Sequence, residues 1–155
     1  TTEITENTEG NKEEVSPFSS SSSVTSESSV VNIPLDELTN RIIGCAIEVH
    51  RLIGPGLLES AYEAALCWEL EQAAIPYARQ VPLPLDYKGH LIDVAYRMDI
   101  VVDDRVLLEL KSIDKLATIH EAQMLTYLKL SGMKVGLLMN FNALTLVQGL
   151  RRFVA

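Results

Sequence analysis

The stretch RVLLELKS, Arg105–Ser112, decides the predicted fold because it is an apolar strand that carries two charges. Alternate side chains of a strand share a face, so Glu109 and Lys111 point away from the face that holds Leu110. Charges in an otherwise dry strand are costly to bury unless they are paired or bind something. The strand therefore contains either a structural ion pair, Glu109 with Lys111 or Arg97, or part of a functional site.

The sequence around this strand alternates helical and strand patterns. Helices are predicted at 35–53, 57–74 and 115–130, and strands at 78–87, 91–102, 105–112 and 134–141, with a short strand or turn in 143–155. The apolar stripes are Leu38, Ile42, Cys45, Ile47, Val49 and Leu52 in the first helix and Ala122, Leu125 and Leu128 in the third. Its prolines indicate that the first strand is either at an edge or irregular, and the crossover helix lets the fourth strand pair parallel with the third. We therefore expect an α/β domain with one mixed sheet flanked by helices.

Two carboxylates are predicted to lie close together in the hairpin formed by the predicted strands 91–102 and 105–112. The turn at 103–104 reverses the chain and places Asp99 roughly opposite residues 108–109. Held together, Asp99 and Glu109 repel each other unless a cation lies between them, and such oxygen ligands suit Mg²⁺ or Mn²⁺. A metal ion acidifies bound water and stabilises charge on a phosphate, while a neighbouring lysine can orient that water.

Two helical motifs supply further candidates. In GLLESAY, residues 56–62, Glu59 and Tyr62 are three apart and share a helix face. The simpler explanation is that Glu59 complements the helix dipole in the first turn. In QMLTY, Gln123 and Tyr127 are four apart on one face, which an ordinary amphipathic helix also explains.

Taken together, the motifs resemble one known family. GLLESAY matches the signature of the GxxExxY protein family, and EVHRLIGPGLLESAYEAAL, YRMDIVV, LLELKS and HEAQMLTYLKLSGMKVGLLMNFN are similar to that family in the same order. The resemblance covers about residues 35–153. That family in turn resembles the PD-(D/E)XK nuclease superfamily, and its Gln…Tyr helix resembles that of RecB-type nucleases. The resemblance implies a restriction-endonuclease-like fold, a mixed β-sheet flanked by helices.

The resemblance also implies roles for individual residues. Asp99 and Glu109 would bind Mg²⁺ or Mn²⁺, Glu59 would reach the metal directly or through water, and Lys111 would orient the water. Met98 stands where the superfamily has a proline, a departure that leaves the aspartate in place. The complete candidate set is Glu59, Asp99, Glu109, Lys111, Gln123 and Tyr127.

The expected function is metal-dependent hydrolysis of phosphodiester bonds in nucleic acid, with DNA favoured over RNA. Gln123 would help to position the lysine or the phosphate, and Tyr127 would support it. Two alternatives stay open. One is a non-catalytic module that binds nucleic acid or protein on a nuclease-like scaffold. The other is an oligomeric structural protein, and a homo-oligomer is open in every case.

Composition and charge limit the interpretation of the N-terminal segment, the binding partners and the cellular location. Residues 1–33 are serine-rich, hold six acids and one base, lack the pattern of a signal peptide, and are predicted to be a disordered tail before a domain at 34–155. The tail contributes −5 to the net charge of −8, so the domain contributes only −3, which counts against a charge-driven nucleic-acid coat. No apolar run reaches the length of a membrane span. Cys45 and Cys67 are predicted to be buried thiols, which fits the cytoplasm or another reducing intracellular compartment.

Four other side chains are candidates of lower weight. His50 either complements the dipole at the end of the first helix or borders the site, and His120 lies one helical turn before the Gln…Tyr pair and could face the site. His90, beside a turn, is expected to be solvated. Trp68 is expected to lie in the core rather than to stack on a base.

Overall fold

Five strands form one mixed sheet in the part of the chain that the structure describes, residues 33–93 and 96–155 of a computed structural model. The strand order is β1 (Tyr77–Pro82), β4 (Arg97–Val102), β5 (Val106–Lys111), β6 (Val135–Asn140) and β7 (Leu150–Val154). β5 and β6 are parallel, and the other neighbours in this sheet are antiparallel. The predicted mixed sheet and its parallel pair are thus confirmed. The predicted disordered tail lies outside the described residues, apart from Ile33 at its end.

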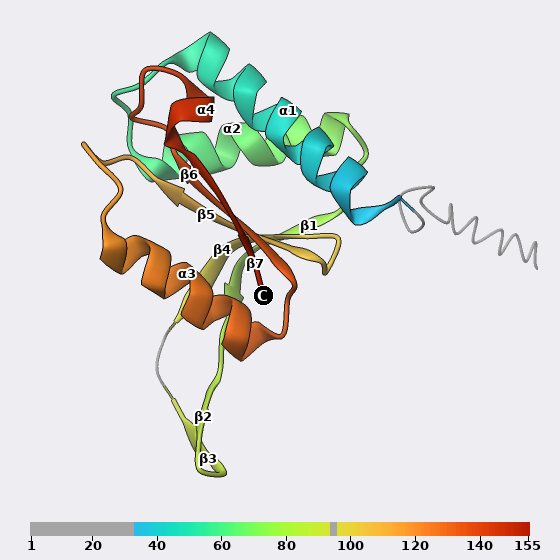
Figure 1. The fold of residues 1–155 in the computed structure, drawn as a ribbon. Helices are drawn as coiled ribbons and strands as arrows, with labels where there is room; N and C mark the ends of the chain where they lie inside the picture. The colour runs from blue at the N-terminus through green and yellow to red at the C-terminus, as the bar shows by residue number, and fades with distance from the viewer. Residues whose placement is uncertain (1–32, 94–95) are drawn as a thin grey trace, which may run out of the picture.

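Helices cover both faces of this sheet (Figure 1). α1 (Leu35–Ile53), α2 (Glu59–Gln72) and the short α4 (Leu146–Gly149) lie on one face, and α3 (Thr118–Ser131) lies on the other. α1 buries Leu38, Ile42, Ala46 and Val49, whose spacing of three and four residues places them on one side. Ile47 and Leu52 are exposed, so the predicted apolar stripe was too broad.

Of the three side chains predicted on the apolar side of α3, only Leu128 faces the sheet. Met124, Tyr127 and Leu128 are buried, whereas Ala122 and Leu125 are exposed. The helix is therefore rotated so that Tyr127 points toward the sheet. Gly132 ends it in the left-handed conformation, with φ 75°, as its position after the last apolar residue predicts.

The central strand β5 lies between two hydrophobic cores. Val106, Leu108 and Leu110 belong to the core under α1 and α2, and Leu107 belongs to the core under α3. Because helices cover both faces, the strand is apolar on both sides. Burying a leucine there stabilises the fold by about 1.5–3 kcal/mol. Glu109 occupies a buried position in this strand where an apolar side chain would be the stabilising choice.

The predicted strands 78–87 and 91–102 are each interrupted. β1 ends at Pro82, and a separate hairpin of β2 (Leu85–Tyr87) and β3 (His90–Ile92) projects from the body of the domain (Figure 1). Pro84 explains the interruption, since it lacks the N–H group that a continuous ladder needs. The sequence KGH, residues 88–90, predicts a turn between these strands. In the structure the turn is a two-residue loop in which both Lys88 and Gly89 have positive φ, and His90 already pairs with Tyr87.

The C-terminal segment and the helices complete the description. The segment predicted as a short strand or turn forms α4 followed by β7, which pairs antiparallel with β6. Within the described ranges, none of the helices has both the length and the apolar character that a membrane span requires. Cys67 is buried as predicted, and Cys45 is half-buried.

Candidate active site

The site begins where the ladder between β4 and β5 stops. The two strands pair at Ile100–Val102 with Val106–Leu108 and no further. Beyond that point, the Leu110 N–H donates to Oδ2 of Asp99 at 2.8 Å, and the Asp99 N–H donates to Oε1 of Glu109 at 3.2 Å. Two carboxylates thus take the place of backbone carbonyls in the opening between the strands. The predicted meeting of Asp99 and Glu109 occurs in the structure.

The neighbouring strand is also distorted at this level. Gln80 of β1 falls opposite Asp99 in the register, but the two do not pair as the flanking residues do. Its φ of 49° lies in the left-handed region, which costs a residue with a side chain about 1–2 kcal/mol. The conformation brings the Gln80 amide to Oε2 of Glu63, to which it donates at 3.0 Å.

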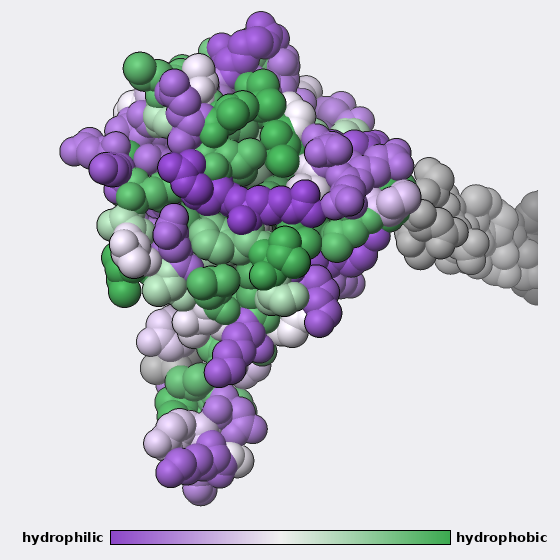
Figure 2. Space-filling model, viewed as in Figure 1, coloured by the Kyte–Doolittle hydropathy of each residue, from purple (hydrophilic) through white to green (hydrophobic). Residues whose placement is uncertain are grey.

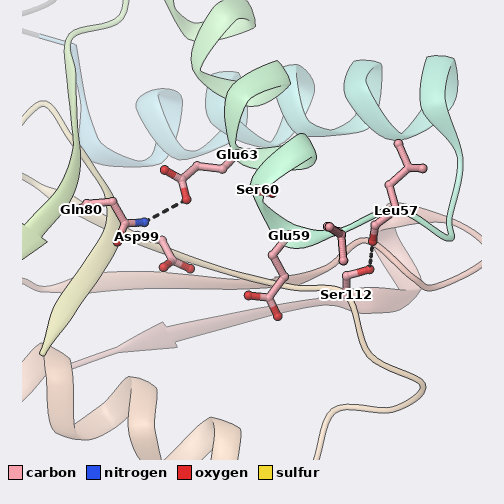
Figure 3. A pocket seen from close by; sticks show the side chains of 8 residues that line it. Leu57, Glu59, Ser60, Glu63, Gln80, Asp99 and Ser112 are labelled. Atoms are coloured by element: carbon pink, nitrogen blue, oxygen red, sulfur yellow. Dashed lines mark hydrogen bonds between the residues drawn. The ribbon is translucent and has the colours of Figure 1, made fainter.

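A cavity of about 500 Å³ opens between α2 and these strands (Figure 3). Its acidic lining consists of Glu59 and Glu63 from α2 and Asp99 from β4. The structure therefore places the predicted Glu59 in the same cavity as Asp99. Glu63 was missed by the sequence reasoning, although its spacing of four residues from Glu59 put both side chains on one helix face.

Glu63 differs from Glu59 because its carboxylate is already engaged. Arg79 Nε donates to Oε1 at 3.0 Å, while the Gln80 amide occupies Oε2. Glu63 is buried, whereas Glu59 is exposed at the start of α2. Glu59 is thus the freer of the two acids to reach a ligand in the cavity.

The buried Glu109 and the half-buried Asp99 form a pair of neighbouring acids. Burial, and then the charge of Asp99, raises the pKa of Glu109 from 4.5 to about 8, although Lys111 acts in the opposite direction. Burial also raises the pKa of Asp99, with the nearby Glu63 adding to the rise, while the hydrogen bond from Leu110 opposes it. In the absence of a cation, the pair therefore retains a proton at neutral pH.

The alternative of a structural ion pair in β5 is not what the structure contains. The ion pairs in the described part of the chain are Arg51–Glu48, Arg79–Glu63, Arg105–Asp103 and Arg152–Asp36. None of these involves Glu109 or Lys111, and Arg97 donates to the Gln80 carbonyl instead. The buried Glu109 and the half-buried Asp99 thus lie together without a paired base within residues 33–93 and 96–155.

This donor set fits a divalent metal by its chemistry. Carboxylate oxygens are the ligands that Mg²⁺ and Mn²⁺ prefer. A bound cation would favour the charged forms of both acids and so oppose the burial that raises both pKa values. Asp99 and Glu109 would hold the ion, with Glu59 as the additional acid. Across the described ranges, no three His, Cys, Asp or Glu side chains are grouped closely enough to form a complete ligand set. Water or backbone oxygen would therefore complete the coordination.

Gln123 and Tyr127 lie on the other side of the split strand pair. The Gln123 amide donates to the Tyr127 hydroxyl at 3.1 Å, as their spacing predicted. Both line a second cavity, of about 590 Å³, beside α3 rather than the cavity of Glu59. Burial raises the pKa of Tyr127, and the charges of Glu109 and Asp99 add to the rise, so the ring lies within electrostatic range of the acids. Of the predicted residues, Glu59 and Asp99 thus line one cavity and Gln123 and Tyr127 line another, while Glu109 and Lys111 line neither of the two.

Tyr62 of the GLLESAY motif has a structural role. Its hydroxyl donates to the Gly54 carbonyl at 2.7 Å and accepts the Leu57 N–H at 3.1 Å, and its ring is fully buried. Gly56 has φ 103°, a conformation that favours glycine. The first and last residues of the motif therefore shape the loop that delivers Glu59 to the cavity.

Asn140 is a second residue that the sequence reasoning missed. It pairs with Lys111 in the parallel ladder and is buried. Its Oδ1 accepts the Ile113 N–H at 3.1 Å, and its Nδ2 donates to the Ile113 carbonyl at 2.9 Å. Ser112 also donates to the Leu57 carbonyl (Figure 3). The segment after Lys111 is thereby fixed to β6 and to the loop before α2.

The structure also places the three histidines and the tryptophan that were candidates of lower weight. His50 is buried and bonds the Ala143 carbonyl at 2.8 Å, which is a structural role, and His90 is exposed as expected. His120 accepts the Ala117 N–H at the start of α3 and lines the second cavity. Trp68 is 57% exposed, so the expectation that it lies in the core is wrong.

The five-stranded mixed sheet, flanked by helices and split where two carboxylates meet, defines a nuclease-like α/β domain. A family model described as the PD-(D/E)XK nuclease superfamily matches residues 36–153. The chain therefore belongs to the PD-(D/E)XK nuclease superfamily, which confirms the predicted superfamily and fold. Searches of curated proteins and of solved structures give no match. The narrower likeness to the GxxExxY family remains a resemblance carried by the motifs.

Proposed function

We propose that the domain is a metal-dependent nuclease that hydrolyses phosphodiester bonds, with DNA preferred over RNA. The observation that carries the proposal is the pair formed by the half-buried Asp99 and the buried Glu109. Both are held in the split between β4 and β5 without a paired base in the described residues. Membership of the nuclease superfamily agrees with it. Mg²⁺ or Mn²⁺, when bound, would acidify a water molecule and neutralise charge on the phosphate.

In this proposal each side chain has a stated task. Asp99 and Glu109 bind the cation through oxygens, and Asp99 is oriented for this by the N–H of Leu110. Lys111 shares a strand face with Glu109, so its ammonium group is placed to donate a hydrogen bond to the attacking water or to the phosphate. Glu59 adds a carboxylate from the neighbouring helix.

A non-catalytic binding module is the second candidate function. It is favoured by the lack of a complete three-residue ligand group in the described ranges and by the engagement of Glu63 with Arg79. Such a module would bind nucleic acid or protein on the same scaffold without turnover.

Cleavage of a substrate panel tests the proposal. Single-stranded, duplex and branched DNA and RNA would be incubated with Mn²⁺, Mg²⁺ or EDTA. We expect metal-dependent cutting that falls by about 100-fold or more in Lys111→Ala, as for the loss of a hydrogen-bond donor to a transition state. Lys115→Ala removes an exposed lysine outside the candidate site and serves as the matched control. Circular dichroism of both variants checks that they fold.

The outcomes separate the two candidate functions. Cutting by wild type and Lys115→Ala, but not by Lys111→Ala, supports the nuclease. Equal cutting by all three proteins would place the chemistry elsewhere or in a contaminant. Binding of nucleic acid with no cutting at all supports the binding module.

Three other expectations remain predictions. A cytoplasmic location would be tested by imaging the tagged protein. A homo-oligomer would be detected by light scattering. A domain boundary near residues 33–34 would be detected by limited proteolysis.

A further inference from the structure

The cavity beside α3 differs in chemistry from the cavity that holds Glu59. We call it the α3 cavity, and it is lined in part by Leu85, Tyr96, Ile119, His120, Gln123 and Tyr127. Among the described residues no acidic side chain lines it, whereas three carboxylates line the other cavity. A nucleic-acid strand carries a negative charge at every phosphate, so it is repelled less on the α3 side.

The α3 cavity offers groups that suit a flat heteroaromatic ring. The rings of Tyr96 and Tyr127 lie 6.3 Å apart in an edge-on arrangement, and Tyr96 is 46% exposed. Gln123 uses its amide N–H on Tyr127, while its oxygen has no hydrogen-bond partner in the described part of the chain. An apolar, partly aromatic cavity with a few polar groups, at about 590 Å³, falls in the range of small-molecule sites.

The α3 cavity also adjoins the candidate catalytic acids. Tyr127 lines it and belongs to the same core as Leu107, which shares a face of β5 with Glu109. Tyr96 precedes Asp99 by three residues, at the entry to β4. A nucleotide whose base entered the cavity would therefore have its phosphate close to the split between β4 and β5.

We propose that the α3 cavity holds the base of an unpaired nucleotide beside the phosphate that is cleaved, so that the substrate is a single strand or a frayed end. A base inside a duplex is stacked and paired, and it cannot enter such a cavity without leaving the helix. Stacking on an exposed tyrosine is tolerant of sequence because every base has a π face. This inference rests on the proposed nuclease function for the position of the phosphate.

The projecting hairpin extends the same surface. Leu85, which lines the α3 cavity, shares one face of the hairpin with Tyr87, His90 and Ile92, as the pairing register shows. Lys88 lies 5.5 Å from the centre of the Tyr87 ring. Figure 2 shows hydrophobic patches among hydrophilic ones along the stalk of the projection, and hydrophilic surface at its tip. An aromatic ring beside a lysine is a combination that binds a single strand without sequence preference.

Binding by the full-length protein in EDTA tests this inference separately from turnover. Fluorescence anisotropy would compare a labelled dT12 strand with an abasic strand of the same length, which carries the same phosphates but no bases. Thymidine monophosphate would be tested as a competitor. The proteins are wild type, Tyr96→Ala, Tyr96→Phe and Trp68→Ala, the last removing an exposed aromatic ring from the opposite face of the sheet.

We expect Tyr96→Ala to weaken dT12 binding about tenfold and to leave abasic binding unchanged. Tyr96→Phe and Trp68→Ala are expected to bind dT12 as wild type does. The inference is overturned if wild type does not bind dT12, if it binds dT12 and the abasic strand equally, or if Tyr96→Ala has no effect. Competition by thymidine monophosphate near the dissociation constant of dT12 would also overturn it, because the cavity would then be a mononucleotide site.

Failure of the base site and failure of the proposed nuclease function give different results. Binding of dT12 through Tyr96 without any Mn²⁺-dependent cutting would sustain the base site and refute the nuclease. Cutting of intact duplex DNA at the same rate by wild type and Tyr96→Ala would sustain the nuclease and refute the base site.

Discussion

Replacing Glu109 with glutamine is predicted to remove most of the pH dependence of stability in the metal-free protein. Burial and Asp99 raise the pKa of Glu109 from 4.5 to about 8. Between these values the unfolded chain has lost a proton that the folded protein keeps, so the free energy of unfolding falls as pH rises, by about 1.4 kcal/mol per pH unit. Over the interval the fall is about 5 kcal/mol. That is comparable with the whole stability of many domains, roughly 5–15 kcal/mol.

The assay is urea unfolding at several pH values between 5 and 8 in EDTA. Glutamine keeps an oxygen that can accept the Asp99 N–H and cannot ionise. We therefore expect wild type to lose stability steeply as pH rises and Glu109→Gln to show a much flatter profile. Glu37→Gln, which removes an exposed carboxylate from the first turn of α1, is expected to follow wild type. Parallel profiles for wild type and Glu109→Gln would refute the reasoning.

Three further predictions concern the scaffold. Tyr62→Phe removes both backbone contacts of the hydroxyl, so we expect the free energy of unfolding to fall by about 1–3 kcal/mol in urea, and an unchanged value would contradict this. Gly149→Ala is expected to lower the melting temperature more than Gly136→Ala. The new Cβ at position 149 would lie 2.2 Å from a backbone carbonyl oxygen, whereas the one at position 136 meets the flexible tip of Met124. A larger loss of melting temperature in Gly136→Ala would contradict this. Burial raises the pKa of Cys67 to about 11, so its thiol should react with a disulfide reagent only as fast as the protein unfolds, and rapid labelling of native protein would contradict this.

The features that sequence predicted correctly depend on short-range periodicity. The faces of β5 follow from the two-residue repeat of a strand, which put Glu109 and Lys111 together. The predicted hairpin then brings Asp99 close to Glu109, although its turn takes in Arg105 as well as residues 103–104, so that Val102 pairs with Val106. The pairing of Gln123 with Tyr127 likewise follows from one helical turn.

The features that sequence missed depend on how elements pack. The cavity of Glu59 joins α2, β1 and β4, and no local pattern says that Gln80 adopts a left-handed conformation to reach Glu63. Trp68 was misplaced because helical spacing gives the relative positions of side chains and not the face that meets the sheet. The break between β1 and β2 could have been predicted from Pro84, since a proline within an extended segment interrupts the strand.

The central claim is that Asp99 and Glu109 hold a divalent cation, and Mn²⁺ titration by calorimetry at pH 7 tests it most directly. Comparison of buffers with different ionisation enthalpies also counts the protons released. We predict saturable binding by wild type with release of about one proton, loss of binding in Asp99→Asn and Glu109→Gln, and retention of binding in Lys111→Ala. No binding by wild type, or equal binding by wild type and the two carboxylate variants, would contradict the claim.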